Sequence, residues 1–91
     1  MKKITYFHLK DCPYCKQANR VIEELKQENP RYQNLEIEMI EENEHPEIIE
    51  AYDYHAVPCM WIGQEKIYEG KLFESYEACK ENVRRVFEVA L

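Results

Sequence analysis

The spacing of apolar and polar residues near the N-terminus predicts a buried strand followed by an amphipathic helix. The run Ile4–Leu9 is rich in β-branched and aromatic residues, which favours a strand inside a sheet. After Cys12 the period changes, and apolar residues recur at helical spacing: Cys15, Ala18, Val21, Ile22 and Leu25. We expect this helix to end near Asn29 and Pro30, because the residue before a proline avoids helical torsion angles.

The middle of the chain predicts an edge strand and a second helix. Leu35–Met39 alternates apolar and acidic residues, as in a strand with one exposed face at the edge of a sheet. We expect residues 31–34 before it to form a polar connection and residues 41–44 after it to form a solvated acidic turn. The second helix is expected to begin at Pro46 and to close by Ala56. Its predicted buried side consists of Ile48, Ile49, Ala51 and Tyr52.

The remainder of the chain predicts a hairpin and a long helix. Cys59–Ile62 is a continuous apolar run of the central-strand type, and residues 63–65 form the expected hairpin loop before the return strand Lys66–Tyr68. The last helix is expected from about Phe73 to Ala90. Its apolar stripe is Tyr76, Cys79, Val83, Val86, Phe87 and Ala90. The predicted order of elements is therefore β-α-β-α-β-β-α.

Length and composition limit the class of protein. A chain of 91 residues fits a single domain spanning residues 1–91. The net charge of −6 argues against a nucleic acid or an anionic membrane surface as partner. No apolar run reaches the roughly 18 residues that a membrane-spanning helix requires. The N-terminal run is too short and too polar for a secretory signal, so we expect a cytoplasmic protein, and we expect a monomer.

Two of the four cysteines carry the candidate chemistry. In a reducing cytosol, a close cysteine pair is more often catalytic or metal-binding than structural. Cys12 is predicted at the N-terminus of the first helix, where unpaired N–H groups and the helix dipole favour the nucleophilic thiolate. Pro13 suits the first helical position, since its missing N–H has no partner there. Cys15 lies about one turn further on, near enough to attack a mixed disulfide on Cys12.

The segment Cys12–Cys15, which reads Cys-Pro-Tyr-Cys, resembles the active-site motif of dithiol glutaredoxins. Lys16 and Ala18 after it are also common in that family. The predicted order of elements is similar to the order in glutaredoxins, so the resemblance covers nearly the full length. It implies an α/β protein with the thioredoxin fold, in which helices flank a four-stranded mixed sheet.

The resemblance implies a dithiol thiol–disulfide oxidoreductase that serves electron transport and cell redox homeostasis. Its substrates would be protein or low-molecular-weight disulfides. Cys12 would be the nucleophile and Cys15 the resolving cysteine, and the pair would form the redox-active disulfide. No bound cofactor is expected. The electrons would come from glutathione as a co-substrate or from a thioredoxin-reductase-type flavoenzyme.

The resemblance also implies binding residues around the cysteine pair. Val57 and Pro58 lie where thioredoxin-fold proteins carry a cis-proline, and the backbone of Val57 would pair with a bound substrate. Tyr14 is expected to point outward and to offer its ring and hydroxyl to the substrate. The candidates for binding substrate or glutathione are Lys10, Pro13, Tyr14, Val57, Pro58, Gly70 and Lys71.

The chain departs from glutathione-using glutaredoxins in two places. Those proteins usually carry Lys or Arg three residues before the first cysteine, where this chain has Leu9. They also have Gly-Gly followed closely by Asp before the last helix, whereas this chain reads Glu69-Gly70 and lacks the Asp. Glu69 would repel an anionic tripeptide, and Lys71 would offset that repulsion.

A different class of function is a metal-binding module. Cys12 and Cys15 would then help to hold zinc or a glutathione-bridged iron–sulfur cluster, although the chain lacks a second close cysteine pair. We assign no metal site. Cys79 fits a buried small hydrophobe on the last helix. Cys59 follows Pro58, and we favour burial in the strand over a third thiol beside the catalytic pair.

Overall fold

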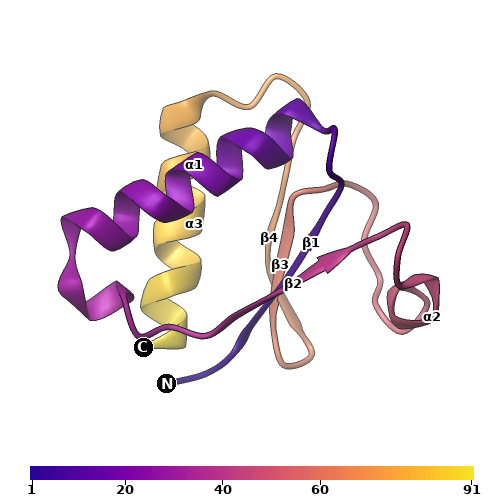
Figure 1. The fold of residues 1–91 in the computed structure, drawn as a ribbon, viewed down its shortest axis with the longest axis horizontal. Helices are drawn as coiled ribbons and strands as arrows, with labels where there is room; N and C mark the ends of the chain where they lie inside the picture. Colours follow the sequence, from indigo (N-terminus) through magenta and orange to yellow (C-terminus); the bar gives the residue numbers. More distant parts are fainter.

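The computed structural model describes residues 1–91 and has a four-stranded sheet with helices on both faces (Figure 1). The strands are β1 (Ile4–His8), β2 (Ile37–Glu41), β3 (Cys59–Ile62) and β4 (Glu65–Glu69). Their order in the sheet is β2-β1-β3-β4. β1 is parallel to β2 and antiparallel to β3, and β3 is antiparallel to β4. The expected mixed sheet and the expected order of elements are confirmed.

The two long helices lie together on one face of the sheet. They are α1 (Pro13–Glu28) and α3 (Tyr76–Ala90), and Figure 1 shows them crossing each other, with the short α2 (Pro46–Ile49) on the opposite side of the sheet. A 3-10 helix, η1 (Pro30–Tyr32), follows α1. No helix combines the length and the apolar character that crossing a lipid bilayer requires.

Two apolar cores result, one on each face of the sheet. Tyr6 belongs to a larger core of 14 buried residues that lies under α1 and α3. Its neighbour Phe7 points to the other face, because successive side chains of a strand alternate, and it belongs to a smaller core with Ile40, Cys59 and Trp61. β1 and β3 are therefore buried on both faces, which accounts for their continuous apolar runs.

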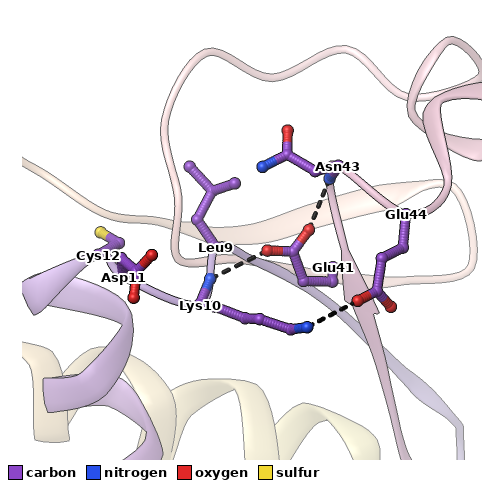
Figure 2. A pocket seen from close by; sticks show the side chains of 7 residues that line it. All are labelled: Leu9, Lys10, Asp11, Cys12, Glu41, Asn43 and Glu44. Atoms are coloured by element: carbon purple, nitrogen blue, oxygen red, sulfur yellow. Dashed lines mark hydrogen bonds and ion pairs between the residues drawn. The ribbon is translucent and has the colours of Figure 1, made fainter.

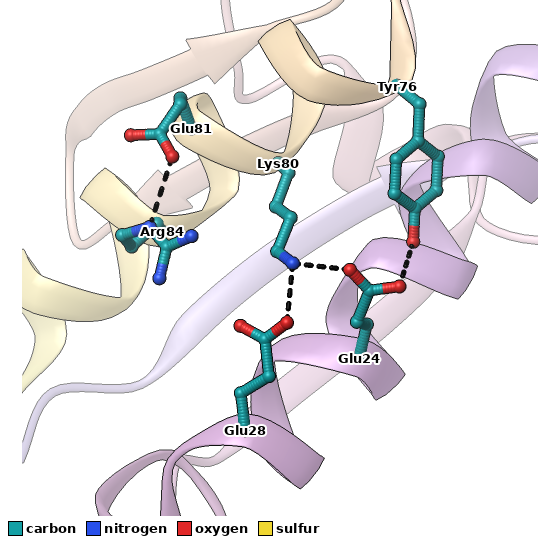
Figure 3. Close-up of polar contacts among 6 residues, drawn as sticks. All are labelled: Glu24, Glu28, Tyr76, Lys80, Glu81 and Arg84. Carbon is teal, nitrogen blue, oxygen red and sulfur yellow. Dashed lines mark hydrogen bonds and ion pairs between the residues drawn. The ribbon is translucent and has the colours of Figure 1, made fainter.

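Polar contacts fix α1 against α3. The Lys80 ammonium on α3 bonds to Glu24 and Glu28 on α1, the latter at 2.6 Å, and the Tyr76 hydroxyl donates to Glu24 at 2.8 Å (Figure 3). The bond from Lys80 lowers the pKa of Glu24. These contacts join the helix that begins at the cysteine pair to the C-terminal helix.

The strand after the first helix begins two residues later than predicted. β2 spans Ile37–Glu41 instead of Leu35–Met39, because the Leu35 N–H donates to the carbonyl of Tyr32 within a turn (3.2 Å). Residues 31–34 are likewise not a plain polar connection, since Tyr32 is buried in η1 and its hydroxyl donates to Glu88. The edge position of this strand is confirmed.

The acidic turn and the second helix also differ from prediction. Glu41 is a buried strand residue and accepts N–H donors from Lys10 and Asn43, so it is not part of a solvated turn. α2 ends at Ile49 and contains no fully buried residue. Partly buried Ile48, Ile49 and Tyr52 pack against the smaller core, whereas the predicted core residue Ala51 is exposed.

The boundaries near the C-terminus are shifted as well. Glu65 is the first residue of β4 and not part of the loop, and that strand continues to Glu69. α3 begins at Tyr76, because the Ser75 hydroxyl oxygen accepts the N–H of Ala78 at 3.1 Å and caps the helix there. Phe73, the predicted start, has a left-handed backbone with φ of 64°. The predicted apolar stripe of α3 is confirmed.

Candidate active site

The register of the sheet brings four connecting segments to one end of the molecule. Cys59 at the start of β3 pairs with Phe7 near the end of β1 and with Glu69 at the end of β4. His8, the last residue of β1, pairs with Glu41, the last residue of β2. The segments that adjoin this end of the sheet are 9–12, 42–44, 57–58 and 70–75. They contain every candidate site residue except Pro13, Tyr14 and Cys15, which follow Cys12 in the first turn of α1.

The first cysteine lies at the N-terminus of α1, as predicted. Cys12 is the N-cap residue with extended backbone angles, and Pro13 occupies the first helical position. The Cys12 carbonyl accepts the first helical bond from the Lys16 N–H at 3.0 Å. No side chain caps the helix, so its first N–H groups are free to act on the Cys12 sulfur or on a ligand bound to it.

The two thiols of the motif differ in access to solvent. Cys12 is half-buried, whereas Cys15 is buried and only 1% exposed. Burial raises the pKa of Cys15 to about 12, although the Leu9 N–H, which donates to its sulfur at 3.5 Å, acts in the opposite direction. Cys12 is therefore the thiol that a substrate can reach, and Cys15 is the sheltered one.

The other two cysteines are buried, as predicted, and they lie on opposite faces of the sheet. Cys59 lies in the smaller core, where burial raises its pKa to about 12 and the indole of Trp61 donates to its sulfur at 3.2 Å. Cys79 lies in the larger core and accepts from the Tyr68 hydroxyl at 3.5 Å. No three His, Cys, Asp or Glu side chains are grouped to hold a metal ion.

A proline and a glycine are in close contact beside the site. The Val57–Pro58 peptide bond is cis, and the buried Pro58 accepts the Gly70 N–H at 2.7 Å through its carbonyl. A Cβ atom at Gly70 would lie 2.8 Å from Cδ of Pro58. Gly70 is therefore required for this packing, which is a reason for its presence that does not involve glutathione.

Glu69 has a structural role that the sequence did not reveal. Its carboxylate accepts the N–H groups of His55 and Ala56, the latter at 2.8 Å, and pairs with the Lys66 ammonium at 2.9 Å. Burial opposes ionisation, but these donors outweigh it and lower the pKa of Glu69 to about 2. The carboxylate thus fixes the backbone that leads into Val57.

A groove opens beside the first cysteine (Figure 2). Its lining residues are Leu9, Lys10, Asp11, Cys12, Glu41, Asn43 and Glu44. The Lys10 ammonium pairs with Glu44 at 2.9 Å, and this contact raises the pKa of Lys10. Lys10 therefore lies near Cys12, as expected, but its charge is already matched by a carboxylate.

The tyrosine of the motif is tied to the loop between β4 and α3. Tyr14 is half-buried, and its hydroxyl oxygen accepts the N–H of Phe73 at 2.8 Å, so the hydroxyl that we expect to face a substrate is already bonded to this loop. Gln17 donates from its side chain to the carbonyl of Glu74 in the same loop at 3.1 Å. Lys71 is exposed on this loop. Nothing in the sequence signalled the contact between Tyr14 and Phe73, because it joins segments far apart in the chain.

Comparison with known proteins defines first the fold and then the family. Thioredoxin 1 from the thermophilic eubacterium Thermosipho africanus TCF52B superposes with a TM-score of 0.60, covering 96% of each chain at 21% identity, so the chain has the thioredoxin fold. The sequence model of the glutaredoxin family matches residues 4–67. The chain belongs to the glutaredoxin family, which implies thiol–disulfide oxidoreductase activity in general. The comparison with curated proteins finds no match.

Proposed function

We propose that the protein is a dithiol oxidoreductase that reduces protein or low-molecular-weight disulfides through Cys12 and Cys15. The observation that carries this proposal is the unequal pair at the start of α1, with an accessible Cys12 one turn before a sheltered Cys15. The free N–H groups at the start of α1 and the positive end of its dipole stabilise the negative charge that the Cys12 sulfur carries as it attacks or leaves. Burial raises the pKa of Cys15, so this thiol stays protonated until it attacks the mixed disulfide.

The proposed reaction has two exchange steps. The Cys12 thiolate attacks one sulfur of the substrate disulfide, which forms a mixed disulfide and releases the other substrate sulfur as a thiolate. Cys15 then loses its proton and attacks the Cys12 sulfur, which releases the second substrate sulfur. Two electrons have passed to the substrate, and the protein is left with a Cys12–Cys15 disulfide.

The surrounding residues orient the substrate in this proposal. Val57 lies just outside β3, which begins at Cys59, so its backbone is available to pair with the chain of a bound thiol substrate. Glu69 and Gly70 fix that position from the other side of the hairpin through Ala56 and Pro58. Substrate positioning thus depends on backbone groups held by β3 and β4.

Two electron donors are compatible with the fold, namely glutathione and a thioredoxin-reductase-type flavoenzyme. Around Cys12 the groove presents the carboxylates of Asp11, Glu41 and Glu44 against the single ammonium of Lys10. This charge balance disfavours an anionic tripeptide. We therefore propose the flavoenzyme as the more effective donor.

Turnover of a disulfide substrate tests the proposal. Each variant is assayed with reduced glutathione and, separately, with NADPH and thioredoxin reductase. Cys12→Ser should abolish turnover with both donors, whereas Cys15→Ser should keep at most a monothiol activity with glutathione and accumulate a mixed disulfide on Cys12. Cys79→Ala, which removes a thiol from the larger core, is the matched control and should stay active. Turnover by Cys12→Ser, or stoichiometric metal in protein purified without oxygen, would contradict the proposal.

A further inference from the structure

The loop between β4 and α3 exposes two neighbouring large apolar side chains. Leu72 is 74% exposed and Phe73 is 86% exposed. Scattered apolar residues are normal on a protein surface, and Met39, at 52% exposure on the edge strand, is an example. Leu72 and Phe73 differ because they are adjacent and because their loop contacts the redox motif.

The protein holds Phe73 in a backbone conformation that an aromatic residue disfavours. Its φ of 64° lies in the left-handed region, and no other residue except glycine has a positive φ. Tyr14 holds this conformation by accepting the Phe73 N–H at 2.8 Å. The Glu74 N–H donates to Lys71 at 3.1 Å, and the Gln17 side chain bonds to the Glu74 carbonyl at 3.1 Å. Two side chains from the first turns of α1 thus keep the ring of Phe73 in solvent.

Resting on the proposed function, we propose that Leu72 and Phe73 form a docking surface for polypeptide disulfides. Tyr14 lies between the two cysteines and contacts Phe73 directly, so the surface is continuous with the reaction site. A polypeptide whose sulfur reaches Cys12 would run along this loop. An apolar side chain next to the substrate cysteine would bury the exposed surface of Leu72 and Phe73.

The groove beside Cys12 indicates a second property of the same partner, namely a positive charge. Asp11, Glu41 and Glu44 line it, and Lys10 is its one cation. The protein as a whole carries a net charge of −6, which adds long-range attraction for a cationic partner. The occupant is therefore a polypeptide with an apolar residue on one side of its disulfide and a basic residue on the other. Glutathione disulfide, which is small and anionic, lacks both features.

Single-turnover oxidation of the reduced protein tests this inference without any electron donor. The probes are synthetic peptides with one intramolecular disulfide, which differ only in having leucine or serine beside the first cysteine and which carry lysine on the other side. A third peptide has leucine with glutamate in place of lysine, and glutathione disulfide is a fourth probe. The wild-type protein should react with the leucine–lysine peptide about tenfold faster than with the serine peptide. It should react more slowly with the glutamate peptide and with glutathione disulfide.

Phe73→Gly is the decisive variant because glycine adopts the left-handed backbone without strain while the aromatic ring is removed. Its thermal stability should match or exceed that of the wild type, and its preference for leucine over serine should fall from about tenfold towards one. Met39→Ser removes an exposed apolar side chain from β2, at the opposite edge of the sheet from β4, and should keep the full preference.

The possible failures are distinguishable. If the wild type reacts equally with the leucine and serine peptides, if Phe73→Gly keeps the preference, or if glutathione disulfide reacts fastest, the docking surface is wrong and the proposed reaction stands. If the reduced protein reacts with none of the four probes, the proposed function and the docking surface fail together.

Discussion

At the scale of single residues, the decisive difference is between two thiols in one helical turn. Cys12 is the N-cap residue of α1, where it meets both solvent and the free N–H groups, whereas Cys15 is buried one turn further along the helix. The same contrast distinguishes Cys12 from Cys59, whose burial raises its pKa to about 12. Cys12 is therefore the one thiol that is accessible for reaction, and burial protects Cys15, Cys59 and Cys79 from oxidants and ligands.

Glu69 provides a prediction at the same scale. Its folded pKa of about 2 lies below the ordinary value of 4.5, so its ionised form stabilises the folded protein fully above pH 4.5, and this stabilisation is lost as the pH falls towards 2. Glu69→Gln should lower the free energy of unfolding at pH 7 by about 1–3 kcal/mol, because it weakens charge-assisted bonds to His55, Ala56 and Lys66. Urea unfolding at pH 7 and at pH 3 measures the difference.

The control for this measurement lies on the same strand. Glu65→Gln changes an exposed carboxylate at the opposite end of β4 and should leave stability unchanged at both pH values. The deficit of Glu69→Gln should shrink at the lower pH. A deficit that is absent at pH 7, or that stays constant through the acid range, would show that Glu69 does not fix the segment before Val57.

At the scale of elements, the position of the redox motif depends on how α1 packs against α3. Both helices turn apolar stripes to the larger core, and Lys80 joins them at the surface through Glu24 and Glu28. Tyr76 adds a hydroxyl contact to the same carboxylate of Glu24. The helix that carries Cys12 is thereby held on one side by the sheet and on the other by α3.

Removal of the interhelical cation tests how much this contact stabilises the fold. Lys80→Gln should cause a small loss of stability, seen as a lower urea midpoint, because its partners are largely solvated, and the loss should shrink in about 1 M salt. Arg84→Gln, which breaks only a contact with Glu81 within α3, is the control and should change stability by less than about 0.5 kcal/mol. Equal losses for the two variants would contradict an interhelical role for Lys80.

The elements also show which parts of the structure a sequence can predict. The stripes of α1 and α3 and the run of β3 follow from periodicity, because each has one consistent buried face or is buried throughout. β2 differs from its predicted range because Leu35 is buried from a turn, whereas Ile40 is buried on the opposite face of the sheet. Periodicity cannot separate those two environments.

The candidate site was predictable to the extent that it lies within one short segment. Cys12, Pro13 and Cys15 share one helical start, so their arrangement follows from local rules. The role of Glu69 and the contact between Tyr14 and Phe73 depend on distant segments meeting at one end of the sheet. No local sequence pattern predicts such contacts between distant segments.

At the scale of the whole molecule, an acidic groove, the cysteine pair and an apolar loop lie at the same end of the sheet. The parallel pairing of β1 with β2 brings the groove to Cys12, and the β3–β4 hairpin brings Gly70 and the Leu72–Phe73 surface to the same end. A substrate at Cys12 therefore has an acidic groove and an exposed apolar loop near it. This arrangement underlies the substrate preference that we propose.

The most direct test of the central claim is alkylation of the reduced protein at mildly acidic pH, with each cysteine followed by peptide mass mapping. We predict that Cys12 is modified first and that Cys15, Cys59 and Cys79 react only after denaturation, because burial protects all three. Modification of Cys15 before Cys12, or protection of both until a metal chelator is added, would contradict the account.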